Sequence, residues 1–98
     1  MNIVKKLEGT KLTISVDGRL DTSTAPELDE ELKASLDGVE MLVMDFTNME
    51  YISSAGLRVL LSAQKVMNSQ GEMIVTGAND TVMEIFDITG FTDILTIR

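Results

Sequence analysis

Residues 51–61 read Tyr-Ile-Ser-Ser-Ala-Gly-Leu-Arg-Val-Leu-Leu, and the next glycine is Gly71. Apolar side chains recur here every three or four residues, which is the spacing of one face of an amphipathic helix. Ser53 or Ser54 can serve as the N-cap, and a glycine such as Gly71 commonly ends a helix. The stretch therefore predicts a helix over 54–70 that buries Leu57, Leu60, Leu61 and Met67.

Two short strands are predicted at the start of the chain. Residues 4–7 and 12–16 are rich in apolar and β-branched side chains. The four residues between them include Gly9 and have the length of a hairpin loop. The chain is therefore expected to open with a β-hairpin.

A first helix is predicted after this hairpin. Thr24 and Glu27 form a capping-box pattern, and Pro26 suits the first helical turn. Apolar side chains follow at four-residue spacing up to Gly38, namely Leu28, Leu32 and Leu36. Residues 41–44 then form a continuous apolar run, which is typical of a central strand.

The last third of the chain predicts strand, helix and strand. Residues 73–75 form a short apolar run, and Asn79 or Asp80 can cap a helix that carries Val82, Ile85 and Phe86. Residues 94–97 predict the final strand. The expected order is ββαβαβαβ, in one domain spanning residues 1–98. Right-handed crossovers between parallel strands then predict an α/β fold with a mixed sheet and helices mainly on one face.

The composition excludes several kinds of function. The chain has no Cys and no His, so disulfides, thiolate metal sites and Ser-His-Asp catalysis are impossible. The net charge of −8 repels nucleic acid and anionic lipid headgroups. No apolar run is long enough to span a bilayer, and the first residues do not read as a signal peptide. We expect a cytoplasmic protein that is a monomer when free and has no cofactor.

Three loops should follow the carboxyl ends of parallel strands, where α/β proteins bind ligands and partners. They are 18–23, 51–57 and 76–79. Two adjacent serines at a helix start are most simply N-caps, and Asp21 is most simply a turn residue. The same helix start could also hold a phosphate, because its free backbone N–H groups point outward. The residue pattern leaves both readings open.

A resemblance to a known family arises from four segments in the same order. Residues 51–61 resemble the signature of the STAS family, in which Asp, Ser, a small residue, Gly and Leu follow a strand. Residues 18–25 are similar to the Gly-x-Leu-Asp segment of that family. Residues 71–75 and 85–90 resemble its fourth strand and last helix. The chain departs from the signature at Ser53, where the family usually has Asp.

The resemblance implies an anti-sigma factor antagonist. Members of this family bind an anti-sigma factor that is also a serine kinase, and phosphorylation of one serine by that kinase releases them. The phosphoacceptor maps to Ser54, with Ser53 as second choice. Asp21, Thr22, Ser53, Ser54 and Gly56 map to the partner-binding surface. A metal-dependent serine phosphatase would restore binding.

Three alternatives compete with this interpretation. The chain could be a STAS module of another signalling complex without a sigma factor. It could be a small enzyme in which Asp21 activates Ser54, although a carboxylate is a poor base for a serine hydroxyl. It could also bind a nucleotide, but no phosphate-binding glycine motif is present.

Overall fold

The computed structural model describes all 98 residues. It contains six strands, three α-helices and one short 3₁₀ helix in the order ββαββαβαβ. The elements are β1 (Asn2–Glu8), β2 (Lys11–Leu20), α1 (Ala25–Ser35), β3 (Met41–Asp45), β4 (Met49–Ile52), α2 (Ser54–Asn68), β5 (Glu72–Thr76), α3 (Asp80–Thr89), the 3₁₀ helix η1 (Phe91–Asp93) and β6 (Thr96–Ile97).

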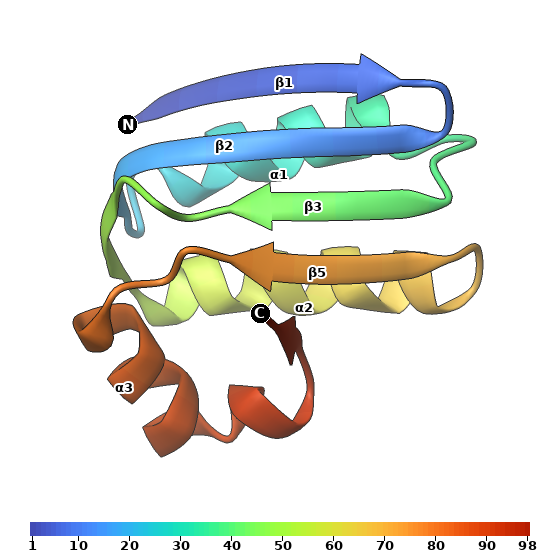
Figure 1. Cartoon of the computed structure of the whole chain (residues 1–98). Coiled ribbons are helices and arrows are strands. Elements are labelled where there is room, and N and C mark those ends of the chain that lie inside the picture. Colours follow the sequence, from blue (N-terminus) through green and yellow to red (C-terminus); the bar gives the residue numbers. More distant parts are fainter.

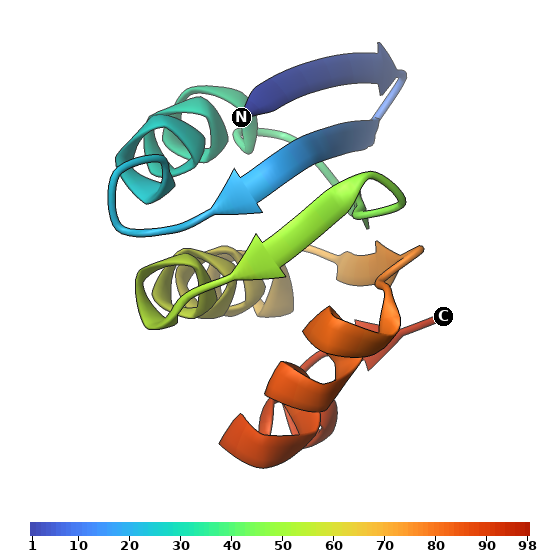
Figure 2. The ribbon, with the colours of Figure 1, turned by 90° about the vertical axis from the view of Figure 1, so that its left-hand side faces the viewer.

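The strands form a mixed sheet in the order β1-β2-β3-β5-β6, with β4 paired to the end of β2. The β1–β2 hairpin is antiparallel, and the other pairs are parallel. Strands β2, β3 and β5 run towards the side of the molecule where all three α-helices begin (Figure 1). Figure 2 views the molecule from that side. The carboxyl ends of the parallel strands and the helix starts therefore share one edge.

The predicted fold class is confirmed, and the predicted element order is wrong by one strand. Residues 49–52 form β4, which sequence analysis assigned to a loop. This strand has four residues and pairs only with Gly18–Leu20, so it is too short to show a periodicity of its own. The last strand is also shorter than predicted, because Ile94 caps the 3₁₀ helix η1 with helical backbone angles and only residues 96–97 pair with β5.

Helices α1 and α2 lie side by side against one face of the sheet, and α3 packs near β4 at its lower edge (Figures 1 and 2). The core forms between the sheet and these helices, where alternate residues of the central strands are buried. They are Leu12, Ile14, Val16, Leu42 and Met44. The longest helix, α2, has 15 residues, and no helix has both the length and the hydropathy needed to cross a bilayer.

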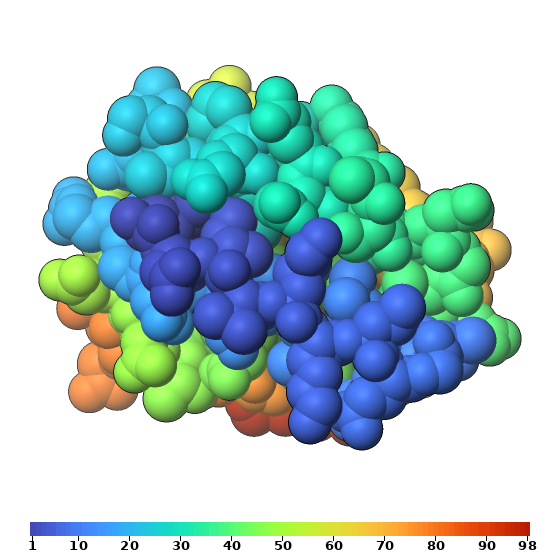
Figure 3. Space-filling model, turned by 90° about the horizontal axis from the view of Figure 1, so that it is seen from above, coloured from blue at the N-terminus to red at the C-terminus, as the bar shows by residue number.

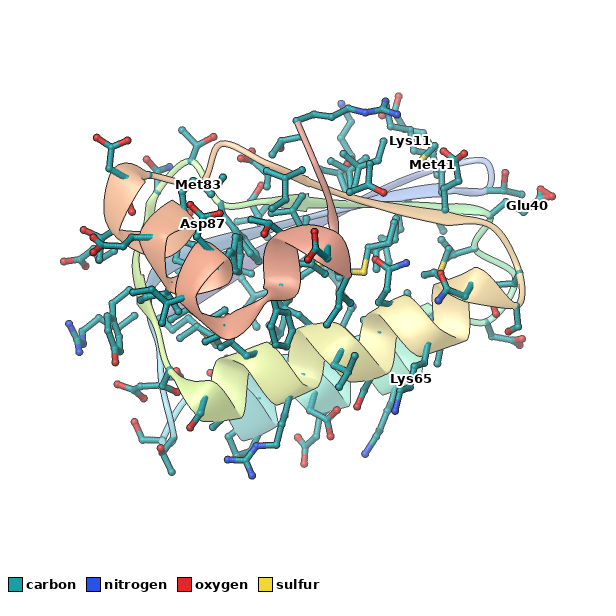
Figure 4. The ribbon with its side chains drawn as sticks, turned by 90° about the horizontal axis from the view of Figure 1, so that it is seen from below. Lys11, Glu40, Met41, Lys65, Met83 and Asp87 are labelled. Atoms are coloured by element: carbon teal, nitrogen blue, oxygen red, sulfur yellow. The ribbon has the colours of Figure 1, made fainter.

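Two apolar residues, Met41 of the run 41–44 and the predicted core residue Leu61, are only half-buried. Met41 lies on the sheet face that no helix covers, on the far side of the sheet from α2 (Figure 4). Leu61 is half-buried, whereas Val59 and Ala63 are buried. Helix α2 packs against α1 as well as the sheet, so its buried face is wider than the predicted stripe.

One edge of the sheet is joined to α1 by charged side chains. The Lys5 Nζ atom lies 2.8 Å from a carboxylate oxygen of Glu31 and donates a hydrogen bond to the Ser35 Oγ atom at 3.3 Å. Seen from above (Figure 3), the residues of β1 and α1 lie beside each other on the surface. Strand β1 therefore covers the outer edge of β2 and contacts the last turns of α1. The start of α1 is left free to position the site.

Candidate functional site

Two strand-to-helix turns meet where β2 and β4 end. Leu20 and Ile52 are partners in the parallel β2–β4 register. The next backbone N–H, that of Ser53, donates to the carbonyl oxygen of Leu20 at 2.9 Å. The residues after these strands, Asp21 and Ser53, therefore begin adjacent turns. The structure thus brings the first two predicted loops together.

The two serines at the start of α2 have different roles. Ser53 is the N-cap, with extended backbone angles, and its hydroxyl accepts a long hydrogen bond of 3.4 Å from the Gly56 N–H. Ser54 is the first helical residue, and its side chain is exposed. The Ser54 hydroxyl makes no hydrogen bond within the domain, so it is the one free to react or to contact a partner.

Gly56 is buried and brings the first turn of α2 close to the strand ends. A Cβ atom at this position would lie 2.8 Å from the Cγ1 atom of Ile52 and 2.8 Å from the Cγ atom of Leu20. Both distances are shorter than van der Waals contact, so only glycine fits without displacement. Gly56 therefore positions Ser54 from inside the domain, and direct contact between Gly56 and a partner remains a prediction.

The Asp21 carboxylate organises the turn before α1. Its Oδ1 atom accepts hydrogen bonds from the Ser23 hydroxyl at 2.8 Å, the Ser23 N–H at 3.0 Å and the Thr24 N–H at 3.2 Å. The hydrogen bond from the Ser23 hydroxyl, with those from the two backbone N–H groups, lowers the pKa of Asp21 against a smaller opposing effect of burial. Asp21 is therefore ionised at neutral pH, and one of its oxygens is fully engaged.

The capping box predicted for α1 does not form. Thr24 is the N-cap, but its side chain caps no helical N–H group. Its hydroxyl instead donates to the carbonyl oxygen of Arg19 at 2.9 Å and accepts from the Asp21 N–H at 2.9 Å. Pro26 lies in the first turn as predicted. Thr22 is exposed beside this turn, with its side chain available to a partner.

The third predicted loop, residues 76–79, supports the strand that leads into the site, β4. The Asn79 Oδ1 atom caps α3 by accepting from the Val82 N–H at 2.8 Å, and its Nδ2 atom donates to the Met49 carbonyl oxygen at 2.9 Å. Gly77 has a positive φ of 75° and packs so tightly that a Cβ atom would collide with Thr47. This loop therefore fixes the start of β4.

Two arginines at the site were missed by sequence analysis. The Arg19 guanidinium stacks 4.5 Å from the centre of the Tyr51 ring, and its Nε atom is 3.9 Å from the Asp21 Oδ2 atom. The Arg58 Nε atom donates to the carbonyl oxygen of Ser54 at 3.4 Å. The spacing of Arg58, four residues after Ser54, could have identified it, since residues i and i+4 share a helix face. No cluster of acidic side chains has the arrangement of a metal site.

The fold and the site define an α/β domain that presents a free serine hydroxyl where two strand-to-helix turns meet. Residues 2–98 match the family model described as the STAS domain. This chain therefore belongs to the STAS domain family.

Known proteins resemble the chain over nearly its whole length. A Bordetella bronchiseptica protein, BtrV, proposed to be an anti-sigma factor antagonist, is 37% identical over 94 residues, covering 94% of this chain and 80% of its own. The anti-sigma-B factor antagonist of Listeria monocytogenes is 34% identical over 104 residues, covering 100% of this chain and 90% of its own.

Solved structures of a more distant relative share the fold. The anti-sigma factor antagonist SpoIIAA in its unphosphorylated form has a TM-score of 0.86 at 15% identity, over 99% of this chain and 88% of that one. The phosphorylated form of Bacillus SpoIIAA has a TM-score of 0.77 at 14% identity, over 99% and 91%. At this identity the likeness establishes the fold alone.

Proposed function

We propose that this chain is an anti-sigma factor antagonist that acts by partner switching, with Ser54 as its phosphorylation site. The observation that carries the proposal is the difference between the two serines. The Ser53 hydroxyl caps α2, whereas the Ser54 hydroxyl is exposed and unbonded at the meeting point of two turns. The relatives from Bordetella and Listeria support the proposed class of function.

In the unphosphorylated state, the surface around Ser54 binds an anti-sigma factor that is also a serine kinase. Binding withdraws the anti-sigma factor from its sigma factor, which then becomes free to engage RNA polymerase. Asp21 holds the turn before α1, and Thr22 and Ser54 supply exposed hydroxyls to the interface. Gly56 keeps the start of α2 against the strand ends.

Phosphorylation then ends the complex. The Ser54 oxygen attacks the γ-phosphorus of ATP held by the kinase, the bond to the β-phosphate oxygen breaks, ADP leaves, and the serine proton passes to a base on the kinase. The product carries about −1.5 to −2 more charge at neutral pH, at a surface that had been in contact with the partner. The added charge and bulk oppose docking. A metal-dependent serine phosphatase would hydrolyse the phosphate and restore binding.

The Asp21 contacts weaken the alternative of a serine enzyme. A general base needs a free oxygen within hydrogen-bond reach of the nucleophile. The Asp21 Oδ1 atom is engaged by Ser23 and Thr24, and its Oδ2 atom faces Arg19. The same site would also suit a STAS module that binds a kinase of another signalling complex, and the identity of the bound partner distinguishes these two roles.

The test is a binding experiment with a candidate anti-sigma serine kinase from the same organism. Wild type and Ser54→Ala should both bind the kinase, with affinities within a few-fold, as measured by calorimetry with ADP. Ser54→Asp should bind at least tenfold more weakly, because it places a charge at the interface. Thr10→Asp adds the same charge at an exposed position of the β1–β2 turn, at the opposite edge of the sheet (Figure 1), and serves as the control. Equal binding by all four proteins would contradict the proposal.

A further inference from the structure

We propose that Arg58 is a positioning residue for the phosphate on Ser54 and holds it against the surface of α2 once the serine is modified. This inference rests on the proposed phosphorylation of Ser54 and adds the group that receives the phosphate. The direct observation is the Arg58 Nε atom, which lies 3.4 Å from the carbonyl oxygen of Ser54. The guanidinium is therefore already folded back over the residue that would carry the phosphate.

The geometry follows from the helix. Long side chains in an α-helix lean towards the N-terminus, so a residue at i+4 covers residue i. Ser54 and Arg58 stand in this relation, and both side chains are exposed. A phosphate on the Ser54 oxygen would project into the space that Arg58 already flanks. The flat guanidinium can donate two hydrogen bonds to a phosphate.

Arg58 also makes no ion pair with an acidic side chain of the domain. The four ion pairs of the domain use Lys5, Lys6, Arg19 and Lys33, and none uses Arg58. The chain has eight basic residues, and Arg58 is one of the four that make no ion pair. Its guanidinium is free to pair with a phosphate without first breaking an ion pair.

The surrounding charges favour the same assignment. Asp29, which lines a hollow of about 470 Å³ together with Thr22 and Arg58, is already paired with Lys33 at 2.8 Å. Asp21 is bonded within its own turn and faces Arg19. Other exposed charged groups near the helix starts are acidic, namely Glu27 in the first turn of α1, Glu50 of β4 and Asp80 of α3. Arg58 is therefore the available cation beside Ser54, since Lys65, the other basic residue of α2, lies in the last turn of that helix.

The phosphorylated form, which does not bind its partner, therefore holds its phosphate in a defined position. The pairing with Arg58 offsets part of the charge that phosphorylation adds to an already acidic domain. It also holds the phosphate over the first turn of α2, where a docking partner would have to displace it. A phosphatase must likewise separate the phosphate from the guanidinium before hydrolysis.

The test installs phosphoserine at position 54 during translation, so that it does not depend on any kinase. The ³¹P chemical shift is then followed against pH at low salt in four proteins: native, Arg58→Lys, Arg58→Gln and Lys65→Gln. Lys65 points to solvent from the same helix, away from the sheet (Figure 4), so Lys65→Gln removes the same charge at a distance. Circular dichroism verifies that all four are folded.

Arg58→Gln should raise the titration midpoint of the phosphate by about 0.3 pH units, which corresponds to about a twofold change in proton affinity. Arg58→Lys should give a smaller rise, and Lys65→Gln should match the native protein. The difference should vanish in 1 M salt, because an exposed pair is screened. Equal midpoints for Arg58→Gln and Lys65→Gln would overturn the inference. Failure of a kinase to modify Ser54 would instead overturn the proposed function and leave this result unaffected.

Discussion

The starts of α1 and α2 lie at the same edge of the sheet, yet they use their polar side chains in opposite ways. At α1, the Asp21 carboxylate and the Ser23 and Thr24 hydroxyls bond to one another and to the backbone. At α2, the Ser53 hydroxyl caps the helix and the Ser54 hydroxyl makes no hydrogen bond. The polar groups of the turn before α1 are paired and support the fold. The start of α2 exposes an unpaired hydroxyl.

The comparison shows why two similar stretches of polar residues should differ in function. Removing a side chain that hydrogen-bonds to several backbone groups costs free energy, because those groups lose their partners. An exposed hydroxyl without partners can be modified without disturbing the fold. This difference should appear in the stability of variants at the two helix starts.

The largest effect is expected from Gly56→Ala. In an unobstructed helix the change would stabilise the protein by about 1 kcal/mol, since Ala is the better helix former. Here the new Cβ atom would lie 2.8 Å from side chains of Ile52 and Leu20, and overpacking of this kind costs about 1–3 kcal/mol. We expect a net loss of up to about 2 kcal/mol in urea unfolding, with the exposed Ser62→Ala on α2 as control. A stabilised Gly56→Ala protein would contradict the packing account.

Ser53→Ala and Ser54→Ala form a matched pair. Ser53→Ala removes the N-cap of α2 and should lower the free energy of unfolding by about 0.5–1 kcal/mol, at the lower end for caps because the bond is long. Ser54→Ala removes a hydroxyl without partners and should change it by less than about 0.5 kcal/mol. Both are measured by urea unfolding at neutral pH. A reversed order would mean that the assignment of the two serines is wrong.

Acid should weaken the α1 turn. The hydrogen bond from Ser23 lowers the pKa of Asp21, and hydrogen bonds from Thr47 lower that of Asp45. Both carboxyls therefore bind protons less readily in the folded than in the unfolded chain, whose ordinary value is 3.8. The stability they provide is complete above that pH and is lost as the pH falls through the folded values.

Asp21→Asn should therefore flatten the loss of stability between pH 5 and the acid limit, as followed by urea unfolding at several pH values. The matched control is Asp37→Asn, which changes an exposed carboxylate that makes no hydrogen bond or ion pair in the domain. If both variants reproduce the wild-type pH dependence, the Asp21 contacts do not stabilise the folded state.

The smallest effect is expected from Ser53→Asp, which restores the residue usual in the family. Asp and Ser are comparable N-caps, and the added carboxylate lies near the positive end of the helix. Repulsion from Asp21 opposes this gain. We expect a rise of about 0.3 kcal/mol in the free energy of unfolding at low salt, and no rise in 1 M salt. A destabilised variant would show that the charge of Asp21 dominates this end of α2.

Much of the fold and part of the site could be predicted from the sequence. The periodicity of Leu57 and Leu60 located α2, and the short apolar runs located the central strands. Strand β4 was not predicted, because it has four residues and forms only by pairing with the end of β2. The sequence also did not show which of Ser53 and Ser54 is the N-cap of α2. Either can cap a helix, and the folded backbone decides which one does.

The most direct test of partner switching through Ser54 is to map the phosphate after incubation with ATP and a candidate anti-sigma serine kinase from the same organism. Wild type, Ser53→Ala and Ser54→Ala are compared by mass spectrometry, with circular dichroism to verify folding. The account predicts one phosphate on Ser54 in wild type, the same phosphate in Ser53→Ala, and none in Ser54→Ala. A phosphate that persists in Ser54→Ala and disappears in Ser53→Ala would contradict it.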